Sequence, residues 1–179
     1  MPGAAFHTGK SKQDYETPDE FIRAVNARFG ELTIDLAAAR SSAKVHCGLA
    51  PVYLGPGSNI GSDSLAVKWS TLAPGRWWLN PPFANIEPWV RKCAAKRPFP
   101  TGITTRNIQD PSFGIYLLIP ASVGANWWAT HVHNKARVHF LSPRLCFDGK
   151  NPYPKDCALC IYPFEHSFVG VGYECWRWK

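Results

Sequence analysis

RWWLNPPF, residues 76–83, is the stretch that decides the fold. The apolar run Arg76–Leu79 favours a buried strand. Residues 80–83 end that strand, because proline has no N–H for a ladder and restricts the residue before it. Residues 86–96 then show apolar side chains at helical spacing. A strand, a turn and a helix in this order predict an α/β unit, and ligands of α/β sheets bind at the carboxyl ends of strands.

Elements of the same kinds are expected on both sides of this unit. Thr17 and Pro18 suit a helix start and Gly30 suits its end, with apolar residues at helical spacing between them. A second helix is expected over 37–44 and another around 124–134. The expected strands are 31–35, 115–119, 138–141, 158–162 and 169–178, and the Gly/Pro-rich stretch 46–62 is expected to be a loop. This alternation predicts an α/β layered fold.

Size and composition predict one folded domain. The chain has 179 residues, of which 45% are hydrophobic and 13% aromatic, so it can form a substantial core and disorder is excluded. No apolar run reaches the roughly 20 residues that span a bilayer. Residues 1–14 are polar, without a signal-peptide pattern, and are expected to be a flexible tail before a domain over 15–179. The expected location is the cytoplasm, with no membrane partner.

The net charge of +7 favours a polyanionic partner, because lysine and arginine neutralise phosphates. The alternative is a basic surface with no role in nucleic-acid binding. Loop 96–114, which holds Lys96, Arg97 and Arg106, is the first candidate for contacting DNA, and 46–62 is the second. A surface insertion without function is the alternative for the first loop.

The six cysteines are expected to be free thiols. Cys157 and Cys160 have the spacing of a zinc ligand pair, but they lie in an apolar run that reads as a strand. Residues three apart on a strand point to opposite faces, so no metal site is expected there. His131 and His133 are interpreted as surface or structural residues of a helix.

Asn80-Pro81-Pro82-Phe83 suits chemistry on a planar amine. The exocyclic amine of adenine is a poor nucleophile, because its lone pair is delocalised into the ring. The amide oxygen of Asn80 and the carbonyl of Pro81 are placed to accept its hydrogens, while Pro82 restricts the backbone. Phe83 offers a face for a flipped base, and such stacking is worth roughly 1–3 kcal/mol. The alternative is an ordinary turn.

The order of the motifs extends this interpretation to the whole chain. They are Tyr15-Glu-Thr-Pro18, Ile34-Asp35-Leu-Ala-Ala38, Asp63-Ser-Leu65, Trp78-Leu-Asn-Pro-Pro-Phe83, Leu117-Leu-Ile-Pro-Ala121, Trp127-Trp128, Arg144-Leu-Cys-Phe147 and Ala158-Leu-Cys-Ile161. In order and spacing, over residues 15–165, the chain resembles the phage-type DNA N-6-adenine methyltransferase (Dam-like) family. That resemblance implies a Rossmann-like methyltransferase fold with a twisted central sheet flanked by helices, and a phage protein acting in a bacterial host.

The resemblance also implies a cofactor, S-adenosylmethionine, and a partner, double-stranded DNA. It places Thr17-Pro18 over the cofactor, Asp35 at its methionine part and Asp63 near its adenosine part. Helix capping is the alternative for Thr17 and Asp35, and a turn is the alternative for Asp63. Arg144 contacts either a phosphate or a core carboxylate. A chain this short has no separate recognition domain, so DNA is read by loops or by a second subunit of a homodimer.

Two departures from the family pattern bear on function. Ala37 and its neighbouring alanines stand where the family has Gly-x-Gly, and Phe83 replaces a common tyrosine. Small alanines still permit close approach of a cofactor. The alternatives to DNA adenine methylation are transfer to another amine (cytosine N4, an RNA base or a glutamine amide) and an inactive relative that binds nucleic acid.

Overall fold

A six-stranded sheet lies at the centre of the computed structural model, which describes residues 15–48, 50–95, 112–164 and 172–179. Its strand order is β1-β4-β5-β7-β6-β8. The strands are β1 (Ile34–Asp35), β4 (Arg76–Leu79), β5 (Gly114–Pro120), β6 (Arg137–Ser142), β7 (Cys157–Pro163) and β8 (Tyr173–Arg177).

The sheet is mainly parallel. β1 pairs parallel with β4, β4 with β5, and β6 with β8, whereas β7 runs antiparallel to both β5 and β6. The carboxyl ends of β1, β4 and β5 therefore meet at one edge. This mixed α/β arrangement is compatible with the Rossmann-like fold that the sequence predicts.

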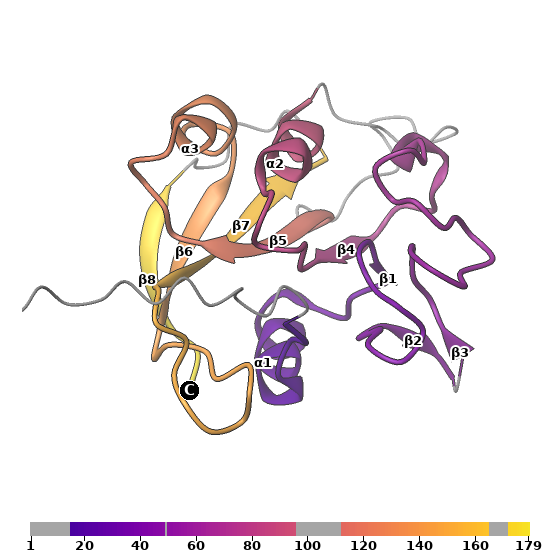
Figure 1. Cartoon of the computed structure of the whole chain (residues 1–179), viewed down its shortest axis with the longest axis horizontal. Coiled ribbons are helices and arrows are strands. Elements are labelled where there is room, and N and C mark those ends of the chain that lie inside the picture. Colours follow the sequence, from indigo (N-terminus) through magenta and orange to yellow (C-terminus); the bar gives the residue numbers. More distant parts are fainter. Residues whose placement is uncertain (1–14, 49, 96–111, 165–171) are drawn as a thin grey trace, which may run out of the picture.

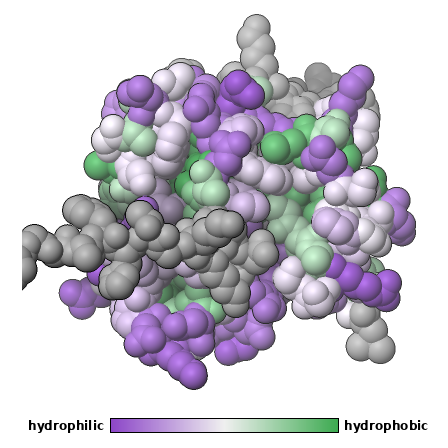
Figure 2. Space-filling view, viewed as in Figure 1, coloured by the Kyte–Doolittle hydropathy of each residue, from purple (hydrophilic) through white to green (hydrophobic). Residues whose placement is uncertain are grey.

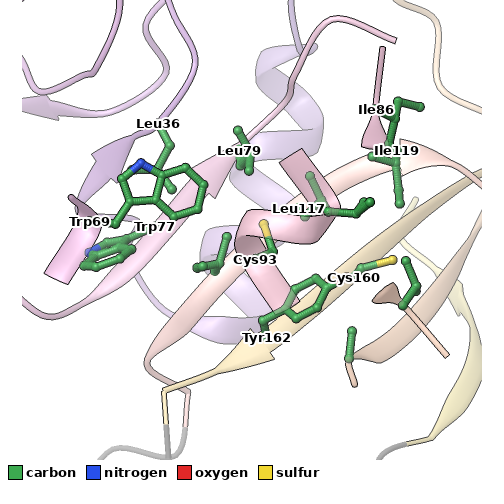
Figure 3. Packing of buried hydrophobic residues seen from close by; sticks show 14 of the residues in the cluster. Leu36, Trp69, Trp77, Leu79, Ile86, Cys93, Leu117, Ile119, Cys160 and Tyr162 are labelled. Atoms are coloured by element: carbon green, nitrogen blue, oxygen red, sulfur yellow. The ribbon is translucent and has the colours of Figure 1, made fainter. Parts of the chain in front are cut away.

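Helices cover both faces of the sheet (Figure 1). α2 (Glu87–Ala94) and α3 (Asn126–His131) lie on one face and α1 (Asp19–Phe29) lies on the other. The side chains of β5 alternate between two cores. Leu117 and Ile119 pack in the core that includes α2 and α3, part of which is drawn in Figure 3, whereas Tyr116 and Leu118 pack in the core that includes α1.

Most of the predicted elements are present. The helices around 18–29, 86–96 and 124–134 are confirmed, and so are the strands at 76–79, 115–119, 138–141 and 158–162. Cys157 and Cys160 belong to different cores, on opposite faces of β7, as the strand spacing predicts. Among the described residues, no group of three or more His, Cys, Asp or Glu side chains is placed to hold a metal.

The helix expected over 37–44 is wrong. This segment is irregular, with a turn at residues 40–42. Its backbone groups are used by distant segments instead, since the Ala38 N–H donates to the Leu54 carbonyl and the Lys44 N–H donates to the Asp35 carboxylate. Tertiary hydrogen bonds thus outweigh the helical propensity of the alanines. The expected loop 46–62 also contains two short strands, β2 (His46–Cys47) and β3 (Ala50–Pro51), and a 3₁₀ turn, η1 (Trp69–Thr71), follows it.

Thr17 does not cap α1, which corrects the prediction from sequence. The N-cap residue is Pro18, whose carbonyl accepts the N–H groups of Phe21 and Ile22. The hydroxyl of Thr17 accepts a hydrogen bond from Asn80 instead. Thr17 therefore joins the start of the helix to the residue after β4, and its predicted place over a cofactor stays a prediction.

The surface mixes polar and apolar residues. On the face shown in Figure 2, hydrophilic residues lie around the hydrophobic patches. Within the described ranges, no helix is long and apolar enough to cross a membrane.

We predict that Leu117→Ala in β5 destabilises the fold by about 2–5 kcal/mol, because the side chain is fully buried and its loss leaves a cavity. Leu65→Ala is the matched control, since Leu65 is 36% exposed, and its effect should stay within about 0.5 kcal/mol. Urea unfolding of both variants measures the difference. Equal effects would contradict the packing described for β5.

Candidate active site

Asn80 directly follows β4, at the edge where the parallel strands end. Its amide nitrogen donates to the Tyr15 carbonyl over 2.7 Å and to the Thr17 hydroxyl over 3.0 Å. A backbone carbonyl can only accept, so the nitrogen must face Tyr15 and the oxygen must point the other way. The two hydrogen bonds therefore set the orientation of the amide.

The Asn80 amide oxygen, Oδ1, is buried and has no hydrogen-bond partner among the described residues. A buried acceptor without a donor costs roughly 1–3 kcal/mol. An acceptor kept in this state beside a cavity is suited to a ligand that brings a donor, such as an amine.

Two cavities are lined in part by residues 80–83. The larger, of about 630 Å³, is lined by Asn80, Pro81 and Pro82. The smaller, of about 300 Å³, is lined by Phe83. Tyr15 lines both. The predicted catalytic residues therefore line two spaces of different size, with Tyr15 common to both.

Small residues form one wall of the larger cavity. They are Ala37, Ala38, Ala39, Ser41 and Ser42. Gly55 faces this wall with φ +143°, and a Cβ there would overlap the Ala38 carbonyl oxygen. Gly55 therefore lets its segment pack directly against the backbone of Ala38. Sequence reasoning missed Gly55, which was one of many glycines in an expected loop.

Asp35 is 2% exposed and lies behind this wall rather than among the residues that line the cavity. Its carboxylate accepts the N–H of Ala37 over 3.2 Å and the N–H of Lys44 over 3.0 Å. Burial raises the pKa of the Asp35 carboxyl from 3.8 to about 6, against the opposing effect of these N–H groups. Asp35 therefore holds the loop that forms the wall, and its predicted contact with a cofactor stays a prediction.

Lys44 continues this support toward Asn80. Its ammonium donates to Glu16 over 2.7 Å and to Asp19 over 2.9 Å. The hydrogen bond and charge of Lys44 lower the pKa of the exposed Asp19 carboxyl. Glu16 follows Tyr15, whose carbonyl holds the Asn80 amide. One set of contacts therefore links Asp35, Lys44 and the Tyr15–Thr17 segment to Asn80.

Asp63 lines the larger cavity, and its Oδ1 accepts the N–H groups of Leu65 and Ala66. Its predicted place near the adenosine part of a cofactor stays a prediction. The turn that carries it is fixed by Lys92 of α2. The Lys92 ammonium donates to the carbonyls of Ser64, Leu65 and Val67 and lies 4.5 Å from the ring centre of Trp69. Burial lowers the pKa of Lys92. Sequence reasoning missed Lys92, because a lysine on a helix gives no signal of contacts with a distant turn.

Four aromatic rings gather beside the smaller cavity. Phe83 lies 5.8–5.9 Å, centre to centre, from Tyr15, Tyr153 and Phe147, and these three also contact one another. Tyr15, Phe83 and Tyr153 line the cavity together with Trp127 and Lys155. The face predicted from Phe83 alone is therefore part of a larger aromatic wall.

Of the four cations predicted to contact DNA, Arg144 is the one that lies in the part of the chain that the structure describes. Arg144 donates to the Asp156 carboxylate over 2.7 Å, and both side chains are exposed. Of the two partners left open by the sequence, a carboxylate is therefore present, although it lies at the surface and not in the core. Lys96, Arg97 and Arg106, like the predicted tail 1–14, lie outside the described residues.

The raised pKa of Asp35 predicts a pH-dependent stability. Because the folded-state pKa lies above the unfolded one, the folded protein binds this proton more tightly. The resulting stabilisation is full below pH 3.8 and is lost as the pH rises through about 6. Asp35→Asn lacks this titration.

The free energy of unfolding of the wild type, minus that of Asp35→Asn, should therefore fall as the pH rises from about 4 to about 7. Urea titrations across this range measure it. A difference that stays constant or rises would contradict the shift.

Comparison with known proteins assigns the chain to a family. A family model described as DNA N-6-adenine-methyltransferase (Dam) matches residues 6–156, which includes Tyr15, Asn80 and Tyr153. No curated protein and no solved structure matches the chain. The family supports methyltransferase activity and implies DNA as the substrate. Since the match spans most of the sequence, this chain belongs to the DNA N-6-adenine-methyltransferase family.

Proposed function

We propose that the protein transfers a methyl group from S-adenosylmethionine to N6 of adenine in DNA. The observation that supports this most directly is the buried Oδ1 of Asn80, which has no hydrogen-bond partner among the described residues and belongs to a side chain that lines the larger cavity. The larger cavity takes the methyl donor and the smaller one takes the target base, so that the two reactants meet at residues 80–83.

The residues of the larger cavity fit this donor. Its volume lies within the range of roughly 300–1,000 Å³ typical of ligand pockets. S-adenosylmethionine carries positive charge on its sulfonium and ammonium groups, and the carboxylates of Glu16 and Asp63 line the cavity. Thr17 and Asp35 do not line the cavity, but they accept hydrogen bonds from Asn80 and Ala37, which do. The bound cofactor supplies an electrophilic methyl group.

Asn80 and Pro81 prepare the amine that receives this group. In the proposed complex, Oδ1 of Asn80 and the carbonyl of Pro81 each accept one N6 hydrogen, which directs the nitrogen lone pair toward the methyl carbon. Asn80 and Pro81 would hold the amine while it takes up the methyl group that the cofactor would supply, and the proton that N6 loses would pass to solvent. Since the amide is already oriented by Tyr15 and Thr17, little reorganisation accompanies the step.

The aromatic wall of the smaller cavity supports a planar substrate. A flipped base costs a few kcal/mol to extract from the duplex, and stacking on Phe83 returns roughly 1–3 kcal/mol. Tyr153 and Trp127 add further ring surface, and Lys155 adds a cation at the same cavity. A base is favoured over a glutamine side chain, because an amide has no ring to stack.

The other substrates remain distinguishable by experiment. Incubation with labelled S-adenosylmethionine and duplex DNA, single-stranded DNA, RNA or protein, followed by nucleoside and amino-acid analysis, identifies the acceptor. N6-methyladenine from DNA is the expected product. N4-methylcytosine would indicate a different base, and binding of DNA without any transfer would indicate an inactive relative.

We predict that Asn80→Ala lowers kcat by about 100-fold or more while leaving cofactor affinity nearly unchanged, because it removes the acceptor that acts on the amine. Asn126→Ala is the matched control, since Asn126 is exposed on α3 and lines neither cavity. Steady-state assays with calorimetry separate the two effects. Near-normal turnover of Asn80→Ala would remove the central claim.

A second prediction concerns the donor cavity. Gly55→Ala should weaken S-adenosylmethionine binding by about tenfold or more, because the new Cβ pushes residues 38 and 55 apart and the wall moves with them. Gly124→Ala is the control, since a Cβ at Gly124 meets nothing within 4 Å. Calorimetry measures both affinities. Unchanged binding by Gly55→Ala would place the cofactor elsewhere.

A further inference from the structure

We infer that Tyr15 couples the binding of the methyl donor to the binding of the target base. The inference rests on the proposed function and adds a positioning residue that the sequence motifs did not assign. Tyr15 lines both cavities, and its carbonyl accepts a hydrogen bond from the amide of Asn80. A displacement of this residue therefore changes both cavities and the amide between them.

The ring of Tyr15 belongs to the wall of the smaller cavity. Its centre lies 5.9 Å from that of Phe83, 5.3 Å from Tyr153 and 5.2 Å from Phe147. The contact with Tyr153 is edge-on and the other two are tilted, all at centre separations typical of aromatic pairs. The ring thus holds residue 15 against the surface on which the base would stack.

Tyr15 and the residue after it also line the larger cavity. Glu16 lines that cavity and accepts a hydrogen bond from Lys44, whose own N–H donates to Asp35 behind the alanine wall. A donor molecule in the larger cavity contacts this segment directly, so it restrains the position of residue 15. The restraint reaches the aromatic wall through the Tyr15 ring and reaches Asn80 through the Tyr15 carbonyl.

Each ligand should therefore favour the arrangement that the other needs. Coupling between two sites is reciprocal, and typical values correspond to about 5- to 150-fold changes in affinity. Occupation of the donor cavity is expected to tighten DNA binding, and occupation of the base cavity to tighten donor binding by the same factor. Without the Tyr15 ring, the segment loses its anchor on the aromatic wall and the two events become independent.

The test uses S-adenosylhomocysteine, the non-reactive product, and a duplex whose methylated adenine has first been mapped by nucleoside analysis and sequencing. Calorimetry gives the Kd of S-adenosylhomocysteine alone and with saturating duplex. In the wild type, the Kd of S-adenosylhomocysteine alone should exceed the Kd with saturating duplex by about fivefold or more. Tyr15→Phe should keep this ratio, because the ring and the carbonyl remain, whereas Tyr15→Ala and Tyr15→Leu should bring it close to one.

Tyr153→Ala is the matched control. Tyr153 has the same side chain and lies in the same ring cluster, but it lines only the smaller cavity. This variant should weaken DNA binding. Once enough duplex is added to saturate it, the ratio of the S-adenosylhomocysteine Kd values without and with duplex should equal that of the wild type. A ratio near one in the wild type, or an unchanged ratio in Tyr15→Ala and Tyr15→Leu, would overturn the coupling. Absence of any methylated adenine would instead overturn the proposed function, so the two failures are distinguishable.

Discussion

The direction of the Asn80 amide is the constraint on which the rest of the site depends. An amide can be placed with its oxygen and nitrogen exchanged at little cost unless its partners forbid one orientation. Here the Tyr15 carbonyl does so, because it only accepts, and the Thr17 hydroxyl accepts from the same nitrogen. The oxygen is thereby left as a buried acceptor. The orientation in which the amide oxygen can accept a hydrogen from an amine is thus set by Tyr15 and Thr17, more than sixty positions away in the sequence.

The sheet explains why such distant segments meet. Asp35 ends β1 and pairs in register with Trp78 of β4, so Asn80 follows two residues beyond the same edge. The Asp35 carboxylate accepts the backbone N–H of Lys44, and the Lys44 ammonium donates to the carboxylate of Glu16. Exposed ion pairs contribute little to stability by themselves. Their value here lies in fixing where the Tyr15–Thr17 segment crosses the end of the sheet.

The parts of this arrangement that could be predicted from sequence are those set by local patterns. β5 and β7 are continuous apolar runs, and residues 80–83 follow a strand with two prolines, so both were recognisable. The helix predicted over 37–44 is wrong, because the helical propensity of the alanines at 37–39 is weaker than the hydrogen bonds that Leu54 and Asp35 accept from that segment.

Non-local contacts explain what was missed. The roles of Gly55 and Lys92 are set by Ala38 and by the turn at 64–67, which no window along the chain brings together with them. Tyr15 was visible as part of a motif, but its place between two cavities depends on Asn80 and on rings from the loop before β7. Spacing along the chain locates such residues only after the sheet has set which segments share an edge.

The same distinction applies to the charge of the molecule. The excess of basic residues favours a polyanion, but composition does not say which cations face it. Lys44 is engaged with Glu16 and Asp19, Arg144 with Asp156, and Lys92 with three carbonyls, so these cations serve the fold. Ion pairs remove equal numbers of both signs and leave the net excess unchanged. Lys155 is exposed and lines the smaller cavity, so it places a positive charge at the proposed base site. Composition alone does not identify this residue.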